Sequence, residues 1–265
     1  MSRVTWDQIG EETYETGASN GVLYPQDEKG LYTKGEAWNG LTGVTESPSG
    51  AEPTALYANN VKYLSLLSAE TFGATIKAYA YPPSFEECDG SAELMAGVSI
   101  GQQKRKAFGL TYQTVIGNDV DNNDHGYKLH IIYGALAAPS ERDYASINDS
   151  PEAIEMSWEV STTPVPVTGK KATATLVIDS TKVDAKKLKA IEDVLYGTDH
   201  TVLAAKPDDW DRNYASYFIK SGDTYKAVTA SSGNAPTWEA GKYYSGDTEP
   251  RLPLPDEIVA IMSAV

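Results

Sequence analysis

The chain has 265 residues, 41% hydrophobic and 22% charged, so it can bury one large core or one core plus a small appendage. Its 22 basic and 37 acidic residues give a formal net charge of −15. Such a surface repels phosphate groups, so specific binding of DNA or RNA is not expected. No apolar run predicts a membrane span or a secretory signal, and a single cysteine, Cys88, excludes an internal disulfide. These features fit assembly in a reducing cytoplasm.

The first sixty residues are rich in glycine and proline and show little periodicity. The stretch GEAWNGLTGVTESPSGAEPTALYANN, residues 35–60, predicts a long loop or an extended arm. A loop of this length in a compact protein is usually functional or is ordered by a partner. A merely flexible loop is the alternative.

Alternation of apolar and polar residues predicts a series of strands beyond residue 60. The predicted strand regions are residues 61–81 (one or two strands), 107–117, 126–139, 154–167 and 171–180. Within the third of these regions, His130 is expected on the face opposite Leu129 and Ile131. The pattern therefore favours a mainly β fold.

Helical patterns are few. Residues 183–197 predict an amphipathic helix that packs on a sheet, with Asp184 as its N-terminal cap and Gly197 at its C-terminal stop. Its apolar face is formed by Leu188, Ile191 and Leu195. Residues 84–90 predict one helical turn, and residues 256–262 a short helix near the end of the chain.

Residues 199–247 differ from the rest of the chain in composition. Eight aromatic residues fall within residues 210–244, and the flanking sequences YGTD and SGDTE nearly repeat each other, as if a module had been inserted into one turn. These aromatic side chains either form a miniature core or stand on the surface as a platform for sugars or a partner. The candidate surface aromatics are Trp210, Tyr217, Trp238 and Tyr243.

The acidic stretch GNDVDNNDHG, residues 117–126, carries oxygen side chains at alternate positions, as a calcium loop does at its start: Asp119, Asp121 and Asn123. The glycine and the glutamate that such a loop needs at positions 6 and 12 are both missing. Strands are predicted on either side. The stretch is therefore interpreted as a polar hairpin connection of about ten residues rather than a metal site.

No motif predicts catalysis or a cofactor. The sequence lacks the usual nucleophile and phosphate-loop patterns, and Cys88 lies among acidic residues that disfavour a thiolate. Structural roles are expected for the three histidines, His125, His130 and His200. An enzyme is therefore not expected, and neither a cofactor nor a metal is assigned.

One basic cluster, QQKRK at residues 102–106, stands out in this acidic chain. Its cations are suited to an acidic patch on a neighbouring copy, and a solvated strand end is the alternative. The candidate contacts between subunits are Lys104, Arg105 and Lys106, together with Trp38 from the predicted long loop.

Eight stretches, taken together and in order, resemble the major tail proteins (tail tube subunits) of long-tailed phages of Gram-positive hosts. They are YETGASNGVLYP (14–25), AWNGLTGVTESPSGAEPT (37–54), YPPSFEECDGSAEL (81–94), IGQQKRKAFGLTY (100–112), GYKLHIIYGALAAPSERDY (126–144), SPEAIEMSWEVSTTPV (150–165), ATLVIDSTKVDAKKLKAIEDVLYG (174–197) and RLPLPDEI (251–258). No single stretch is a chemical motif, so the resemblance rests on their number and order.

The resemblance implies a tail-tube-type β-sandwich with one flanking α-helix, long loop or arm extensions and a small β-rich insert. Residues 1–198 and 248–265 would form the tube domain, and residues 199–247 the insert on its outer wall. Six-membered rings would stack into a hollow tube that conducts DNA without gripping it, and the loop at 35–60 would reach the next ring. The implied location is the virion, after assembly in the host cytoplasm.

The implied partners are other copies of the chain, the tape measure and tail terminator proteins, and the passing genome, with no membrane. A phage surface protein that binds a receptor or glycan through the aromatic insert is the alternative.

Overall fold

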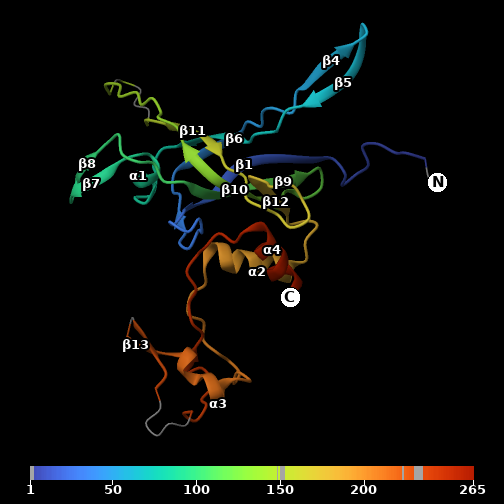
Figure 1. Cartoon of the computed structure of the whole chain (residues 1–265). Helices are drawn as coiled ribbons and strands as arrows, with labels where there is room; N and C mark the ends of the chain where they lie inside the picture. The colour runs from blue at the N-terminus through green and yellow to red at the C-terminus, as the bar shows by residue number, and fades with distance from the viewer. Residues whose placement is uncertain (1–2, 148, 150–152, 223, 230–234) are drawn as a thin grey trace.

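The computed structural model describes residues 3–147, 149, 153–222, 224–229 and 235–265 (Figure 1). The fold is mainly β, as predicted. The strands are β1 (Thr13–Pro25), β2 (Glu36–Ala37), β3 (Leu41–Glu46), β4 (Pro53–Ala58), β5 (Val61–Leu67), β6 (Gly73–Ala78), β7 (Ala92–Met95), β8 (Val98–Ile100), β9 (Phe108–Asn118), β10 (Asn122–Ala137), β11 (Met156–Thr162), β12 (Thr175–Asp179), β13 (Phe218–Ser221), β14 (Thr224–Ala227) and β15 (Tyr243–Tyr244). The helices are α1 (Phe85–Cys88), α2 (Ala185–Tyr196), α3 (Trp210–Asn213), the 3-10 turn η1 (Tyr214–Ser216) and α4 (Pro255–Ser263). None of the described helices is long and apolar enough to cross a membrane.

The main sheet has the strand order β2-β1-β9-β10-β11-β6-β3, and β12 also pairs with β10. The strand β10 therefore has two partners on one side: β12 along residues 128–132 and β11 along residues 135–137. Gly134 lies between these two segments with a φ of +59°, and a Cβ there would come within 2.3 Å of Thr163 O. The irregular backbone at Gly134 lets the sheet divide into two layers.

The first core fills the space between the layer of β3, β6 and β11 and the layer of β1, β9 and β10. Its centre is aromatic: Trp158 is fully buried, and its ring centroid lies 5.0 Å from that of Phe85. The ring of Trp38 lies 4.7 Å from Phe85, and its Nε1 donates a hydrogen bond of 2.9 Å to Ala80 O. Trp38 is only 3% exposed, so its predicted role as a contact between subunits is wrong. Its ring is needed to fill the core of its own subunit.

The second core lies on the opposite face of β9 and β10, where α2 and α4 cover the sheet (Figure 1). Alternation along β10 directs Leu129, Ile131 and Tyr133 toward these helices, and His130 to the other face, as predicted. The predicted helix is confirmed as α2: Asp184 accepts a hydrogen bond of 2.9 Å from Lys186 N. The chain therefore has three layers, two of strands and one of helices.

Several segments project from this body (Figure 1). The strands β4 and β5 form a long hairpin that stands away from the body, and β7 and β8 form a shorter hairpin on another side. Of the two alternatives predicted for residues 35–60, the long loop is wrong, because β2, β3 and β4 lie in this range. The extended arm agrees with its last part, where β4 is the first strand of the long hairpin. Asn59 and Asn60 turn the long hairpin with φ values of 50° and 62°, as a type I′ turn requires.

Residues 199–247 lie at the end of the molecule opposite the long hairpin (Figure 1). Their described part folds around a separate small core of Trp210, Val228 and Tyr243, with the three-stranded sheet β14-β13-β15. At its base, Thr198 N donates to Thr248 O at 3.1 Å, and Thr248 N donates to Thr198 O at 3.0 Å. The two connections to the body thus run side by side. The division into a tube domain and an insert stays a prediction.

The substitution Gly134→Ala tests the division of the sheet. We expect Gly134→Ala to lower the free energy of unfolding by about 3 kcal/mol, because it combines a left-handed backbone with a clash against the Thr163 backbone. Gly17→Ala is the matched control, since Gly17 has a φ of +71° but nothing within 4 Å of the added Cβ. Its cost should be about 1 kcal/mol. Urea unfolding measures both, and equal costs would contradict the role given to Gly134.

Candidate assembly surface

The long hairpin, here called the arm and defined as residues 50–70, carries many exposed apolar side chains. Ser49 and Thr71 close its base through two backbone hydrogen bonds of 2.8 Å. Beyond this base, and within the part of the chain that the structure describes, β4 and β5 pair only with each other. The exposed large hydrophobic residues of the arm are Leu56, Tyr57, Val61, Tyr63, Leu64, Leu66 and Leu67. An isolated two-stranded hairpin is marginal in water, and an exposed apolar surface of this kind marks an interaction site.

A polar cluster holds the root of the arm to the sheet. Glu46, the last residue of β3, accepts a hydrogen bond of 2.6 Å from Tyr112 Oη. The ring of His130 stacks on Tyr112 with centroids 4.7 Å apart, and its Nδ1 lies 3.5 Å from Glu46 Oε1. The close approach of His130 is the main reason that the pKa of Glu46 lies below its ordinary value. The cluster therefore joins β3 to the two central strands.

The same histidine also joins β1 to this cluster. His130 Nε2 lies 2.9 Å from Thr114 Oγ1 and 3.2 Å from Glu15 Oε1, and Lys128 pairs with Glu15. Partial burial raises the pKa of Glu15, but hydrogen bonds from Lys128 and Thr114 outweigh it and bring the pKa below its ordinary value. Periodicity placed His130 on this face, but its carboxylate partners lie far away in the sequence and could not be foreseen.

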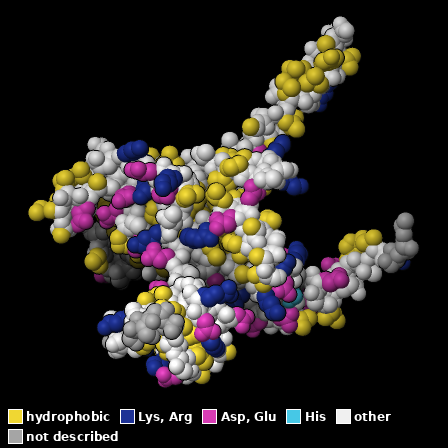
Figure 2. Space-filling model, turned by 60° about the horizontal axis from the view of Figure 1, so that its bottom comes forward, with side chains coloured by type: hydrophobic (Ala, Val, Ile, Leu, Met, Phe, Trp, Pro, Cys, Tyr) yellow, Lys and Arg dark blue, Asp and Glu magenta, His cyan; other side chains and the backbone are white. Residues whose placement is uncertain are grey.

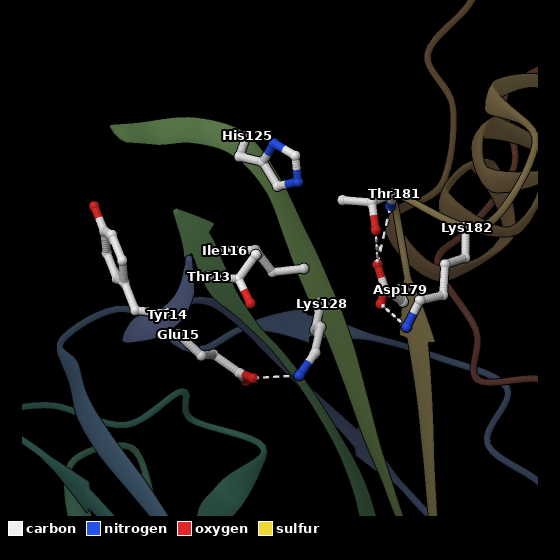
Figure 3. Close-up of a pocket in the computed structure, with 9 residues that line it drawn as sticks. All are labelled: Thr13, Tyr14, Glu15, Ile116, His125, Lys128, Asp179, Thr181 and Lys182. Atoms are coloured by element: carbon white, nitrogen blue, oxygen red, sulfur yellow. Dashed lines mark hydrogen bonds and ion pairs between the residues drawn. The ribbon is translucent and has the colours of Figure 1, made fainter. Parts of the chain in front are cut away.

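The groove beside this cluster is drawn in Figure 3. Two lysines line it, and both are paired: Lys128 with Glu15, and Lys182 Nζ with Asp179 at 2.9 Å. Asp179 also accepts a hydrogen bond of 2.6 Å from Thr181 Oγ1. Because carboxylates neutralise these cations, the groove offers no concentrated positive charge to an anionic ligand.

The acidic stretch at residues 117–126 is a hairpin tip, as predicted, but the connection is shorter than expected because β9 continues to Asn118 and β10 begins at Asn122. Its side-chain oxygens do not converge on one point. Both carboxylate oxygens of Asp119 accept from Gly10 N at 3.0 Å, and Asn123 Oδ1 accepts from Tyr14 Oη at 2.8 Å. The tip therefore fastens the N-terminal segment to the body.

The basic cluster is mostly engaged within the chain. Arg105 Nη1 lies 3.3 Å from Asp89 Oδ1 and donates to Ala137 O at 3.1 Å, and Lys106 Nζ lies 3.0 Å from Glu87 Oε2. Lys104 is exposed. The predicted contacts of this cluster with another subunit stay a prediction, for which Lys104 is the most accessible member.

Cys88 is buried, and burial raises the pKa of its thiol to about 12, as expected for an unreactive cysteine.

The aromatic residues of the insert are used mainly for packing. Trp210 is fully buried and Tyr243 is 2% exposed, so their prediction as surface aromatics is wrong. Tyr217 and Trp238 are half-buried, with ring centroids 5.5 Å and 5.0 Å from that of Trp210. Among the described insert residues, Val202 is the one exposed large hydrophobic side chain. The miniature-core alternative is therefore favoured over an exposed stacking platform.

Comparison with known proteins gives little similarity. No protein-family model matches the sequence. The curated proteins likewise contain no match.

Two solved structures are similar at low sequence identity. One is the cryo-EM structure of the anti-feeding prophage (AFP) baseplate, 6-fold symmetrised, with a TM-score of 0.34 and 9% identity over 69% of this chain and 100% of that chain. The other is the hybrid structure of the SPP1 tail tube, with a TM-score of 0.31 and 10% identity over 65% of this chain and 79% of that chain. Such TM-scores do not establish a shared fold.

Acid unfolding tests the cluster at the root of the arm. Because the folded-state pKa of Glu46 is lowered, its stabilising contribution is complete above the ordinary pKa of 4.5 and is lost as the pH falls through the folded value. We expect the free energy of unfolding of Glu46→Gln to fall less steeply than that of the unmodified chain between about pH 5 and about pH 3. Glu70→Gln, which removes an exposed carboxylate at the base of the arm, is the control. Equal slopes for the unmodified chain and Glu46→Gln would contradict the role of the cluster.

Proposed function

We propose that this chain is a structural protein of a phage tail: the major subunit of the tail tube, assembled as stacked six-membered rings through which DNA passes into the host. The observation that carries the proposal is the arm, a two-stranded apolar ribbon that has no further partner strand among the described residues of its own subunit. The colinear resemblance of eight sequence stretches to major tail proteins supplies the kind of assembly.

The arm is suited to contacts between copies because its apolar side chains stand on both faces of the ribbon. Cross-strand pairing places Leu56 opposite Leu64 on one face, whereas the neighbouring Tyr63 lies on the other. A free subunit exposes both faces to water, and docking in a neighbour buries them. The association free energy therefore comes mainly from residues that contribute nothing to the core of the free subunit.

The order of the layers indicates which side of the subunit faces the channel of the proposed tube and which side faces outward. The layer of β3, β6 and β11 lies farthest from the helices and the insert (Figure 1). Opposite the buried side chains of β6 and β11, the other face of these strands carries polar residues: Thr75, Lys77, Ser157 and Glu159. With this polar face toward the channel, the helices and the insert lie on the outer wall, where added mass disturbs neither the channel nor the stacking.

The charge of the chain fits a channel that conducts DNA without holding it. Affinity for DNA rests on cations that displace condensed counterions, and a subunit with a net charge of −15 works against such binding. The further partners would be the tape measure and tail terminator proteins. The subunits would assemble in the host cytoplasm and reside in the virion.

Two matched deletions test the proposal. In the first, Asn-Gly replaces residues 50–70 and joins Ser49 to Thr71; in the second, Asn-Gly replaces residues 199–247 and joins Thr198 to Thr248. Both pairs are antiparallel partners in the structure, so a two-residue turn suits each junction. We expect the chain without its arm to remain folded but monomeric, because the removed residues lie outside both main cores. The chain without its insert should form tubes like the full chain.

Negative-stain electron microscopy and sedimentation of the concentrated proteins measure the outcome, with thermal unfolding as the check on folding. Tubes built by the chain without its arm would contradict the part given to the arm. If the full chain forms no hollow tubes with ring repeats even when tail assembly initiators are present, the proposed function is wrong.

A further inference from the structure

We propose that the arm of one copy adds edge to edge to the β7–β8 hairpin of a neighbouring copy, and that Lys62 and Glu93 pair across this contact. This inference rests on the proposed function and identifies the surface that receives the arm.

Both hairpins lack the strands that a stable sheet requires. The strands β4 and β5 form one two-stranded sheet and β7 and β8 another, so each of these strands has one edge without a partner strand among the described residues. Three or more strands with an apolar face are needed for a sheet that is stable in water. Joining the two hairpins by their edges gives a four-stranded sheet and satisfies backbone groups of both.

The two hairpins are also alike in being apolar and exposed. The β7–β8 hairpin carries Leu94, Met95 and Val98 on its surface. Figure 2 shows hydrophobic side chains along the arm and on the projection at the opposite side of the molecule. Contact between the two surfaces would remove both apolar patches from water in one step.

Charge determines which pairs of hairpins are compatible. Lys62 is the only charged residue of residues 53–67, and Glu93 is the only charged residue of residues 92–100. Both side chains are exposed, and Glu93 Oε1 accepts a hydrogen bond of 3.0 Å from Gly97 N in the hairpin turn. A charge buried in an apolar contact is costly unless an opposite charge meets it. Residues 53–67 of the arm therefore fit the β7–β8 hairpin better than they fit the same residues of a second arm, where two lysines would meet.

The positions of the hairpins favour a contact that propagates. They leave the body on different sides, so the contact joins two different surfaces of the same chain (Figure 1). Such head-to-tail contacts generate rings or filaments, whereas a contact between two identical surfaces closes as a dimer. Pairing of unlike hairpins is thus the arrangement consistent with a tube.

Charge reversal tests the pair. We expect Lys62→Glu and Glu93→Lys each to raise the critical concentration for tube assembly about tenfold, because each puts like charges into the contact. The double variant Lys62→Glu/Glu93→Lys should recover most of the loss, because the opposite charges are restored. Lys170→Glu, in an exposed turn, is the control for net charge. Single variants that assemble like the full chain, or a double variant that stays impaired, would overturn the pairing.

Cross-linking tests the contact independently of its charge. Because the one native cysteine is buried, a chain with Lys62→Cys and a differently tagged chain with Glu93→Cys offer one accessible thiol each. A short bismaleimide should link the two chains in assembled mixtures but should not link either variant to itself. Linkage of Lys62→Cys chains to one another would show that arms pair with arms and would overturn the inference. Tubes without any link between the two variants would overturn it too, while leaving the proposed function intact.

Discussion

The structure depends on the double pairing of β10. One stretch of this strand bonds to β12 and the next to β11, and the change of partner takes place at Gly134. This division separates an aromatic core from a helix-covered core, so that both faces of β9 and β10 are buried. The same strand carries His130, which holds β1 and the end of β3 together. The arm is therefore anchored to a central strand of the main sheet.

The apolar residues of the chain form two sets, one buried in the cores and one exposed on the two projecting hairpins. Those of the three layers are buried within the subunit and stabilise it alone. Those of the arm and of the β7–β8 hairpin remain in water, at a cost that only another molecule can remove. Because the two sets do not overlap, the stability of the subunit and the strength of association can change independently.

Much of the fold follows from local patterns in the sequence. Alternation located β6 and β9 to β12 and the face of His130, and the cap at Asp184 located the start of α2. It did not locate β1, β2 and β3, which lie in the glycine- and proline-rich first sixty residues. Large aromatic residues outside periodic segments were misplaced: Trp38 and Trp210 fill cores, although their neighbours read as loop or surface. A tryptophan outside a periodic segment gives no sequence signal that shows whether its side chain faces the core or the solvent. The hairpin turn at Asn59 and Asn60 carried a usable signal, because asparagine tolerates the positive φ values that a type I′ turn requires.

The candidate site was harder to predict than the fold. The cluster at the root of the arm brings Glu15, Glu46 and His130 together from three strands far apart in the sequence, and no short motif encodes such a meeting. The basic cluster at residues 102–106, in contrast, was conspicuous in the sequence. Its composition indicated an external partner, but Arg105 and Lys106 meet acidic residues of their own chain. Composition shows that the charged residues are present, but the fold determines which groups they pair with.

The paired threonines at 198 and 248 have a consequence for how such a chain can diversify. Their reciprocal hydrogen bonds fix the two ends of residues 199–247 beside each other, whatever lies between them. The entropy cost of closing a chain segment rises by only about 0.6 kcal/mol for each doubling of its length. Segments of very different length can therefore join these two residues at nearly the same entropy cost. A change in the length of this segment leaves the hydrogen-bonded pair at its base unaltered.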